Sequence, residues 1–506
     1  MSKTFCLIYL LAGLASLSAT ASCAKSTLFQ GGTIITFDEA SQLPVALRDS
    51  SLLVTGDSIV NIFGGSNDLT LPTDTEVVNV HGKIISPGFV DTHRHSWQTA
   101  YKTIGSNTTL AEYFSRYGEF TQAGTVFDPD DIYIGTLAGL YEPINAGVTT
   151  ILEHAHGTFS SETSEAYLNA AMDSGVRMAF CYAFHELSNG FSFQEQLANF
   201  ADLMKNERLN SEDLVQIGVA YDSFIQDNNN TEVVVDLINN NNVSALTTHF
   251  LSGPWSHANS PSKLDQLGLM NGTTPIVFSH ASYVTNDDAE LLRKYDQYIS
   301  TTPESEMHYG HSHHYNPLIQ DQSALGVDTH FTFSSDIVGQ ARMWLQSIRL
   351  RFFYQSLDNW KIPRNNPMSA NQAFTLATRS GALAMRRADL GVLATGKKAD
   401  IVAFDGDSPN MLGWSDPVAA IILHSNVGDV RHVMIGGEWR KRDGELVTKQ
   451  NRTEVQNEFI ESAKRIRKIW LDTPLPELQG EFNGLSHVDY VDAYTVDAVR
   501  GNGTGY

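Results

Sequence analysis

The stretch "SPGFVDTHRHSW", residues 86–97, is typical of an apolar strand that a Pro-Gly pair opens and two histidines end. Side chains alternate along a strand, so His93 and His95 point to one side and Arg94 to the other. Two imidazoles on one side of a strand end can bind one metal ion. A pair of exposed or hydrogen-bonded histidines would fit the same letters, so the rest of the chain has to decide between the two interpretations.

Apolar strands that alternate with helical segments follow that stretch. The strands expected after it are GVTTILEH, GVRMAFCYAF, VQIGVAYDSF, VSALTTHF, PIVFSHA, YISTTPE and DTHFTFSSD. Several of the segments between them begin with Ser, Thr or Asp, the residue types preferred at helix N-caps. Eight strands alternating with helices predict a parallel sheet, and eight is the number that closes a (β/α)8 TIM barrel. The expected fold class is therefore α/β.

Both ends of the chain carry short alternating strands with glycine-bearing turns. STLFQGGTIITFD and SSLLVTGDSIVNIFG precede the barrel, and KADIVAFDGD and VRHVMIGGEWRKRDGELV follow it. We therefore expect one small β-sandwich formed by both chain ends. The predicted division of the chain is a signal peptide at 1–24, the N-terminal part of the sandwich at 25–88, the barrel at 89–385, the C-terminal part of the sandwich at 386–450, and a C-terminal helix and tail at 451–506.

The first residues are typical of a secretory signal peptide. Lys3 precedes the apolar run FCLIYLLAGLASL, and small residues follow as far as Ala24. Cleavage there leaves Cys181, with Cys23 as the one other candidate, so no disulfide framework is expected. Six N-x-S/T sequons agree with a secreted glycoprotein. They begin at Asn107, Asn229, Asn242, Asn271, Asn451 and Asn502.

Composition excludes several classes of partner. The formal net charge of −23 opposes binding to nucleic-acid phosphates and to anionic membrane surfaces. A hydrophobic content of 42% and a charged content of 18% fit a globular protein with a sizeable core. The sequence contains no HExxH, GxSxG, GxGxxG, P-loop or CxxC motif, so nucleotide-binding and serine-hydrolase classes have no support. We expect a small-molecule substrate and neither nucleic acid nor membrane as partner, and a homo-oligomer is left open.

Residue types that bind metals gather at the carboxyl ends of the expected strands. In a TIM barrel those ends converge on one mouth, where active sites are built. Surface residues without a function would not be expected at the end of each of these apolar strands. The residues are His93 and His95, then Glu153, His154 and His156, then His249, His280, Glu304, Glu306 and Asp336.

With these residues in place, the chain resembles the amidohydrolase superfamily, in the branch of cytosine/adenosine-deaminase-like and triazine-hydrolase-like enzymes. PGFVDTHRH, THF, FSHAS, FSSD, ATRSGALAM and GVLATGKKADIVAFD carry the resemblance, which spans residues 28–447. It implies that one metal ion is bound by His93, His95, His249 and Asp336. Three nitrogens and one carboxylate suit Zn²⁺, with Fe²⁺ as the alternative.

The resemblance also implies roles for the residues around that ion. Asp336 would take a proton from the metal-activated water and pass it to the leaving group, and His280 would polarise the substrate or hold the hydroxide. No lysine ends the fourth strand, where the bridge to a second metal would be expected, so a single ion is predicted. His154, His308 and Trp97 are expected to bind the substrate, although core packing fits Trp97 equally well.

One position departs from the family pattern. Deaminases of this branch carry a glutamate three residues after the third histidine, and here that position is Ser252, which cannot carry protons near neutral pH unaided. Glu304 or Glu306 could supply the carboxylate instead. We therefore expect a secreted, mononuclear metal-dependent hydrolase of a carbon–nitrogen bond, other than a peptide bond, or a similar bond in a small cyclic or amide substrate. The alternatives are an aminohydrolase of a purine- or pyrimidine-like ring and a non-catalytic, metal-binding descendant.

Overall fold

The computed structural model describes residues 25–65, 70–211, 214–225, 229–256, 258–311, 315–482, 488–496 and 498–499. The predicted signal peptide at 1–24 and the sequon at Asn502 lie outside these ranges. Within them, no helix is both long enough and apolar enough to cross a bilayer.

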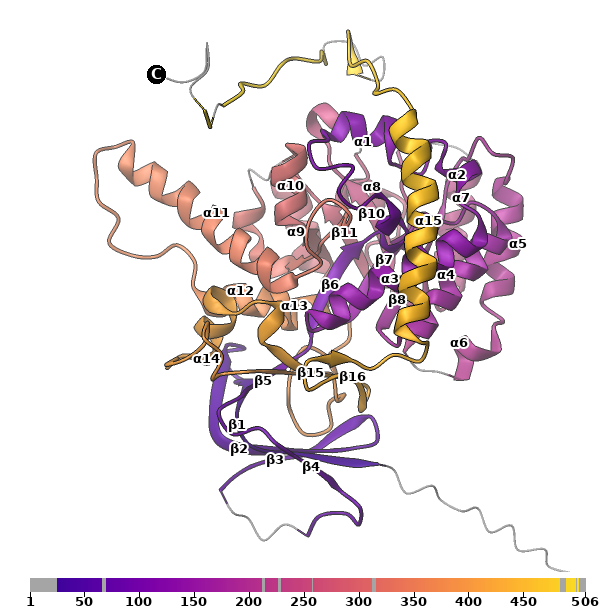
Figure 1. Ribbon diagram of the computed structural model, residues 1–506. Coiled ribbons are helices and arrows are strands. Elements are labelled where there is room, and N and C mark those ends of the chain that lie inside the picture. The colour runs from indigo at the N-terminus through magenta and orange to yellow at the C-terminus, as the bar shows by residue number, and fades with distance from the viewer. Residues whose placement is uncertain are drawn as a thin grey trace, which may run out of the picture.

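Eight parallel strands form the predicted barrel (Figure 1), and they follow one another in hydrogen-bonded order. The chain just after the eighth strand returns to the first, because the backbone N–H groups of Val327 and Asp328 donate to the carbonyl of His93 at 3.1 and 2.8 Å. The TIM-barrel prediction is therefore confirmed. The strands are β6 (Phe89–Arg94), β7 (Val148–Ala155), β8 (Arg177–Phe184), β9 (Val215–Tyr221), β10 (Leu246–Phe250), β11 (Ile276–His280), β12 (Tyr298–Thr301) and β13 (Ser323–Leu325).

The eighth strand lies earlier in the chain than the sequence predicted. β13 covers only Ser323–Leu325, whereas the expected strand at 328–336 forms turns, with Asp328 at a φ of 69°. A strand of three residues is too short for side-chain alternation to indicate it. The predicted strand was therefore wrong, and the carboxyl end of the true strand lies next to Asp328 rather than next to Asp336.

Helices surround the barrel and follow its strands (Figure 1). Thr109, Asp128, Ser160, Ser192 and Thr285 each form a capping box, in which the cap side chain and the third helical residue satisfy each other's backbone N–H groups. The α-helices are α1 (Leu110–Arg116), α2 (Ala123–Val126), α3 (Pro129–Asn145), α4 (Ser161–Ser174), α5 (Phe193–Leu203), α6 (Glu207–Ser211), α7 (Asn229–Asn240), α8 (Pro261–Gln266), α9 (Asn286–Tyr295), α10 (Pro303–Tyr309), α11 (Ile337–Leu357), α12 (Ala370–Ala377), α13 (Arg379–Ala384), α14 (Pro417–Ala419) and α15 (Arg452–Asp472). The single-turn or irregular helices are η1 (Ser96–Tyr101), η2 (Gly253–Trp255), η3 (Asn316–Leu318), η4 (Gln320–Gln322), η5 (Ala420–His424) and η6 (Val427–Asp429).

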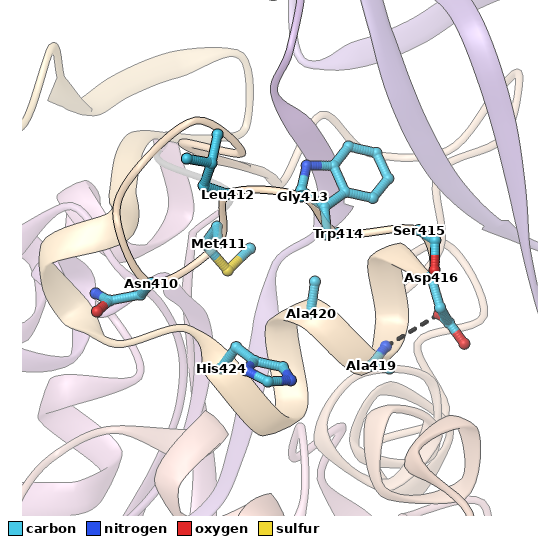
Figure 2. Close-up of a pocket in the computed structure, with 10 residues that line it drawn as sticks. All are labelled: Asn410, Met411, Leu412, Gly413, Trp414, Ser415, Asp416, Ala419, Ala420 and His424. Carbon is cyan, nitrogen blue, oxygen red and sulfur yellow. Dashed lines mark hydrogen bonds between the residues drawn. The ribbon is translucent and has the colours of Figure 1, made fainter.

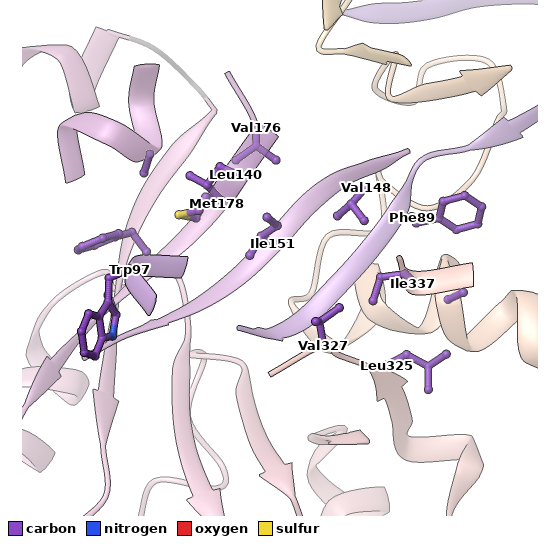
Figure 3. Close-up of a cluster of buried hydrophobic side chains, with 14 of the residues drawn as sticks. Phe89, Trp97, Leu140, Val148, Ile151, Val176, Met178, Leu325, Val327 and Ile337 are labelled. Carbon is purple, nitrogen blue, oxygen red and sulfur yellow. The ribbon is translucent and has the colours of Figure 1, made fainter. Parts of the chain in front are cut away.

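Apolar side chains fill the space between the barrel strands and the helices around them. All residues of β7 and β8 are buried, as expected for parallel strands that are covered on both faces. Figure 3 shows part of this core, in which Val148 of β7 lies beside Phe89 of β6, and Ile151 and Val327 belong to the same buried cluster. Each such side chain stabilises the fold by about 1.5–3 kcal/mol relative to an exposed one, so the core holds the strand ends in place.

Strands from both ends of the chain form one further sheet of nine strands. Its two halves meet where β5 pairs antiparallel with β14, with Ile401 opposite Pro87. The predicted boundary at 88/89 falls between β5 and β6, and the boundary at 385/386 falls just after α13. The strands are β1 (Ser26–Phe37), β2 (Pro44–Thr55), β3 (Ser58–Gly64), β4 (Glu76–Asn79), β5 (Ile84–Pro87), β14 (Ile401–Phe404), β15 (Val430–Ile435), β16 (Glu438–Arg442) and β17 (Glu445–Leu446).

The C-terminal helix α15 lies along the outside of the barrel, beside α3 (Figure 1). Its Trp470 is fully buried, and the Trp470 indole N–H donates to the carbonyl of Arg116 at 2.7 Å. The Arg116 guanidinium in turn donates to the carbonyls of Trp470, Thr473 and Pro474. These bonds fix the segment between α1 and α2, which reaches the mouth of the barrel.

Candidate functional site

Six imidazoles from four strands meet at the carboxyl ends of the barrel strands; we call them the imidazole cluster. His93 lies at its centre, with its ring centroid 4.8 Å from that of His95, 4.9 Å from that of His249 and 5.0 Å from that of His280. The structure therefore brings these four predicted residues together. The cluster consists of His93, His95, His154, His156, His249 and His280.

The carboxylate of the cluster belongs to Asp328 and not to the predicted Asp336. Asp328 Oδ1 lies 3.4 Å from His93 Nε2 and 3.2 Å from His95 Nε2. Asp336 instead caps α11, where its side chain accepts a hydrogen bond from the Val338 N–H at 3.0 Å. The prediction failed because it followed the misplaced eighth strand, whose last residue is Asp336.

The hydrogen bonds behind two of the imidazoles fix their tautomers. His95 Nδ1 lies 2.9 Å from the carbonyl of His154, which can only accept, so Nδ1 carries the proton and Nε2 presents a lone pair to Asp328 Oδ1. His249 Nδ1 likewise donates to Asp222 Oδ2 at 2.7 Å. Lone pairs and a carboxylate that face one another repel unless a cation lies between them.

The chemistry of these donors fits a divalent metal ion such as Zn²⁺. His93 Nε2 is buried and has no hydrogen-bond partner among the described residues. Nitrogens of His93, His154 and His249 lie within 4.8 Å of one another, as do the ligand atoms of His93, His95 and Asp328. Because His93 Nδ1 is 2.8 Å from Ser279 Oγ, only Nε2 can bind a metal, so both sets share one ligand atom.

Burial and neighbouring charges set the protonation states of the groups in the cluster. Burial lowers the pKa of His93 to about 3, so its imidazole is neutral. Burial favours the neutral form of Asp328, but the adjacent imidazoles of His93 and His95 outweigh it and hold the pKa of that carboxyl well below its usual range. Burial also opposes protonation of His249, yet the neighbouring Asp222 carboxylate raises the pKa of His249 to about 9. Asp222 therefore stabilises positive charge at His249, as it would beside a bound cation.

A hydrogen-bonded chain orients His280 from behind. Thr302 Oγ1 donates to Glu306 Oε1 at 3.1 Å, so His280 Nδ1 donates to Thr302 Oγ1 at 2.9 Å. This arrangement leaves the Nε2 lone pair of His280 facing Asp328 Oδ2 at 3.9 Å. Glu306 is buried, and burial raises its pKa well above the usual range. The predicted Glu306 thus lies behind His280, where its Oε1 is 3.4 Å from Nδ1.

Three predicted site residues have surroundings that do not match their predicted roles. The carboxylate of Glu304 accepts from Gln340 of α11 at 3.0 Å, and among the described residues no hydrogen bond or ion pair joins it to the imidazole cluster. Trp97 is 0% exposed, so it cannot stack on a substrate. Its indole N–H instead donates to His156 Nδ1 at 2.9 Å, and the side chain supports the cluster from the core. His308 contacts the ring of Tyr309, with a centroid distance of 4.7 Å.

Besides Asp328, sequence reasoning missed two further carboxylates. Asp222 directly follows β9 and accepts from both the backbone N–H and Nδ1 of His249, each at 2.7 Å. Its position after the fourth strand was a usable signal, because the strand ends converge. Glu119 lies in the loop between α1 and α2, with Oε2 3.6 Å from His156 Nδ1 and a side chain 14% exposed. Burial and the nearby Asp222 raise the pKa of Glu119 to about 7, and no sequence pattern indicates this loop.

A hollow of about 270 Å³ lies elsewhere, between the loop of residues 410–416 and η5 (Figure 2). Asp416, one of its lining residues, caps α14 by accepting from the Val418 and Ala419 N–H groups. No residue of the imidazole cluster lines this hollow, so it is separate from the candidate metal centre.

Comparison with known proteins supports the interpretation of this site. The profile of the Amidohydrolase family matches residues 84–440. A 5-methylthioadenosine/S-adenosylhomocysteine deaminase of Desulfitobacterium hafniense is 23% identical over 421 residues, which cover 80% of this chain and 90% of that protein. A 5′-deoxyadenosine deaminase of Methanosphaera stadtmanae is 23% identical over 427 residues, which cover 82% and 95%.

Solved structures share the fold at low sequence identity. An adenosine deaminase from Xanthomonas campestris with bound zinc superposes with a TM-score of 0.73 at 18% identity, covering 88% of this chain and 99% of that chain. An atrazine chlorohydrolase from Arthrobacter aurescens complexed with zinc gives 0.67 at 18% identity, covering 86% and 100%.

The barrel, its histidine-rich mouth and these matches define the protein as a metal-dependent hydrolase. The chain belongs to the amidohydrolase family, as its sequence resemblance indicated. It is an enzyme that acts on carbon–nitrogen bonds other than peptide bonds.

Proposed function

We propose that the protein is a mononuclear, zinc-dependent aminohydrolase that removes the amino group from a purine-like ring. The observation that carries the proposal is the close approach of His93 to His95 and His249, together with the Asp328 carboxylate beside Nε2 of His93 and His95. The relatives named above are deaminases of adenosine derivatives, and they match across most of this chain. A small heterocyclic amine is therefore the favoured substrate over an open-chain amide.

The chain's own residues can manage the protons of such a reaction. When bound, the ion would act as a Lewis acid and lower the pKa of a water molecule from 15.7 to about 7. Asp328 Oδ2 accepts from Ser305 Oγ at 2.5 Å and faces His280, so it can take a proton from the attacking water. His280 can accept a hydrogen bond from the same water through Nε2. Burial lowers the pKa of His280 and keeps its imidazole neutral, and the Thr302 and Glu306 chain keeps it correctly turned.

The experiment uses the purified full chain loaded with zinc. Adenosine, 5′-deoxyadenosine, 5′-methylthioadenosine and S-adenosylhomocysteine are supplied separately, and ammonia release and product mass are measured. We expect ammonia from at least one of these rings, loss of turnover after chelation, and recovery when zinc returns. No ammonia from any of them, or turnover that survives metal removal, would contradict the proposal.

One other activity has a specific observation in its favour. Ser252 stands where the deaminase pattern has a glutamate, and the structure places it just before η2 with a φ of 50°. A hydrolase that displaces a halide or an alkoxide has less need of a proton donor for its leaving group. Chloro- and methoxy-substituted rings belong in the same panel for this reason, scored by product mass.

We also propose that the protein enters the secretory pathway and carries N-linked glycans. The signal-peptide pattern supports this, and the asparagines of the described sequons are exposed at Asn107, Asn229, Asn242, Asn271 and Asn451. Treatment of protein secreted by a eukaryotic host with an N-glycosidase should lower its mass. An unchanged mass, or retention of the protein inside the cell, would contradict this proposal.

A further inference from the structure

The site needs a proton donor for the substrate ring, and Ser252 cannot be that donor. Attack of water on an aminated ring carbon pushes electrons onto the neighbouring ring nitrogen, which then requires a proton. A serine hydroxyl does not give up its proton near neutral pH. Another acid of this chain must therefore reach the substrate if the proposed deamination is correct.

Glu304 and Glu306 do not meet this need. Glu304 is bound to Gln340 on α11. Glu306 is 1% exposed and accepts from the Thr302 N–H and hydroxyl, behind His280. A substrate at the mouth of the barrel would contact His280 before it could contact Glu306.

Glu119 lies against the imidazole cluster, unlike Glu304, and its side chain is partly exposed, unlike that of Glu306. Its carboxylate lies beside His156, whose ring is tilted by 37° against that of His95 at a centroid distance of 3.9 Å. It is also close enough to His249 and Asp222 for their charges to act on it. The side chain is largely buried but remains 14% exposed, so a substrate over the cluster can contact it. No lysine or arginine forms an ion pair with it among the described residues.

The loop that carries Glu119 is held firmly on its N-terminal side. The carbonyl of Tyr117 accepts from Gln98 at 3.1 Å, and the Tyr117 hydroxyl donates to the carbonyl of Ile104 at 2.9 Å. Arg116 is tied to the carbonyls that follow α15. A carboxyl group on a segment held at this many points is preorganised for proton transfer.

We propose that Glu119 is the catalytic acid of this site and delivers a proton to the substrate ring from beside His156. The inference rests on the proposed deamination and names the residue that replaces the carboxylate absent at Ser252. Electrostatics agree with the geometry, because burial and the Asp222 charge favour the protonated form of Glu119 at neutral pH.

The protons and electrons of the reaction balance with two carboxyl groups. The water oxygen bonds to the ring carbon, one water proton passes to Asp328, and the Glu119 proton passes to the ring nitrogen that receives the C=N electron pair. The carbon–amine bond then breaks, and its electron pair leaves with the nitrogen. That nitrogen takes the proton from Asp328 and departs as ammonia, while the new hydroxyl group gives its proton to Glu119 as it becomes a carbonyl. Both residues return to their starting states.

The test compares Glu119→Gln with wild type, using the aminated ring from the panel above that gives most ammonia. Glutamine keeps the size of the side chain but cannot donate the proton, so kcat should fall by about 10²- to 10⁴-fold with little change in KM. Zinc content and melting temperature should match wild type, because Glu119 is not placed among the ligands. Glu165→Gln, at an exposed position on α4, is the matched control and should keep wild-type kcat.

A second variant separates catalysis from structure. Glu119→Ala removes the carboxyl group altogether, and added formate should restore part of its kcat if a proton donor is what was lost. Wild-type kcat in Glu119→Gln, loss of zinc together with activity, or no effect of formate on Glu119→Ala would overturn the role of Glu119 while leaving the proposed function standing. Absence of ammonia from wild type would instead overturn the proposed function, and this inference with it.

Discussion

Asp222 is the most informative position to change outside the set of proposed metal ligands. Its two carboxylate oxygens accept from two donors of one residue, because the backbone N–H of His249 binds Oδ1 and Nδ1–H binds Oδ2, both at 2.7 Å. The Asp222→Asn side chain has the same shape but only one acceptor oxygen. Whichever way the amide turns, one of the two His249 donors then faces an NH₂ group.

The magnitude follows from that lost bond. A hydrogen bond to a charged group contributes about 1.5–3 kcal/mol, and 1.4 kcal/mol corresponds to a tenfold change in a binding constant. We therefore expect Asp222→Asn to weaken zinc binding by about ten- to a hundredfold, the range found for residues that orient metal ligands. The Nε2 lone pair of His249 would no longer be held toward His93.

The assay is competition for zinc against a chromogenic chelator, with protein folding checked by circular dichroism. Asp202→Asn is the control, because Asp202 is exposed and pairs with Lys205 across a surface turn. Zinc affinity that is the same in Asp222→Asn as in wild type would refute the argument that Asp222 orients a metal ligand.

Three further changes test how the site is supported. Gly326→Ala should lower both the melting temperature and zinc content, since its Cβ would lie 2.8 Å from the backbone nitrogen of His93; a normal zinc content would contradict this. Arg177→Ala should destabilise the protein by about 3–5 kcal/mol in urea unfolding, because the buried carboxylate of Asp400, which directly precedes β14, would lose its ion-pair partner. Burial lowers the pKa of Lys441 from 10.5 to about 8, so the unfolded chain binds more protons between these values and stability should rise from pH 8 to pH 10. Lys441→Met should flatten that rise, and an equal slope in both proteins would count against the argument.

Much of the architecture could be predicted from the sequence, because its strands are long and apolar. Parallel strands that are covered on both faces are continuous hydrophobic runs, and β7 and β8 are recognisable for that reason. The histidines of β6 and β10 could be placed because they end such runs. The pairing of the two chain ends was predictable from their shared alternation.

The carboxylates were harder to predict, for two physical reasons. Asp328 follows a strand of three residues, which leaves no periodic signal, and the alternating DTHFTFSSD beside it folds as turns. Glu119 lies on a loop whose position is fixed by α15, a helix more than three hundred residues away in the chain. Contacts over such a separation arise only from tertiary packing, so no local pattern could place that side chain at the cluster.

Two features of the backbone support a functional role for the cluster. His280 and Asp328 both adopt left-handed conformations, with φ values of 70° and 69°. Residues other than glycine hold such conformations at a cost of about 1–3 kcal/mol. The surrounding packing therefore stabilises the fold enough to hold two strained residues at the mouth of the barrel, one at the end of β11 and one after β13.

The most direct test of the account is the zinc stoichiometry of the purified wild-type protein, Asp328→Asn and Asp336→Asn, measured by elemental mass spectrometry after dialysis. We predict one zinc ion per wild-type chain, loss of that ion in Asp328→Asn, and full retention in Asp336→Asn. Full retention in Asp328→Asn would contradict the metal centre described above.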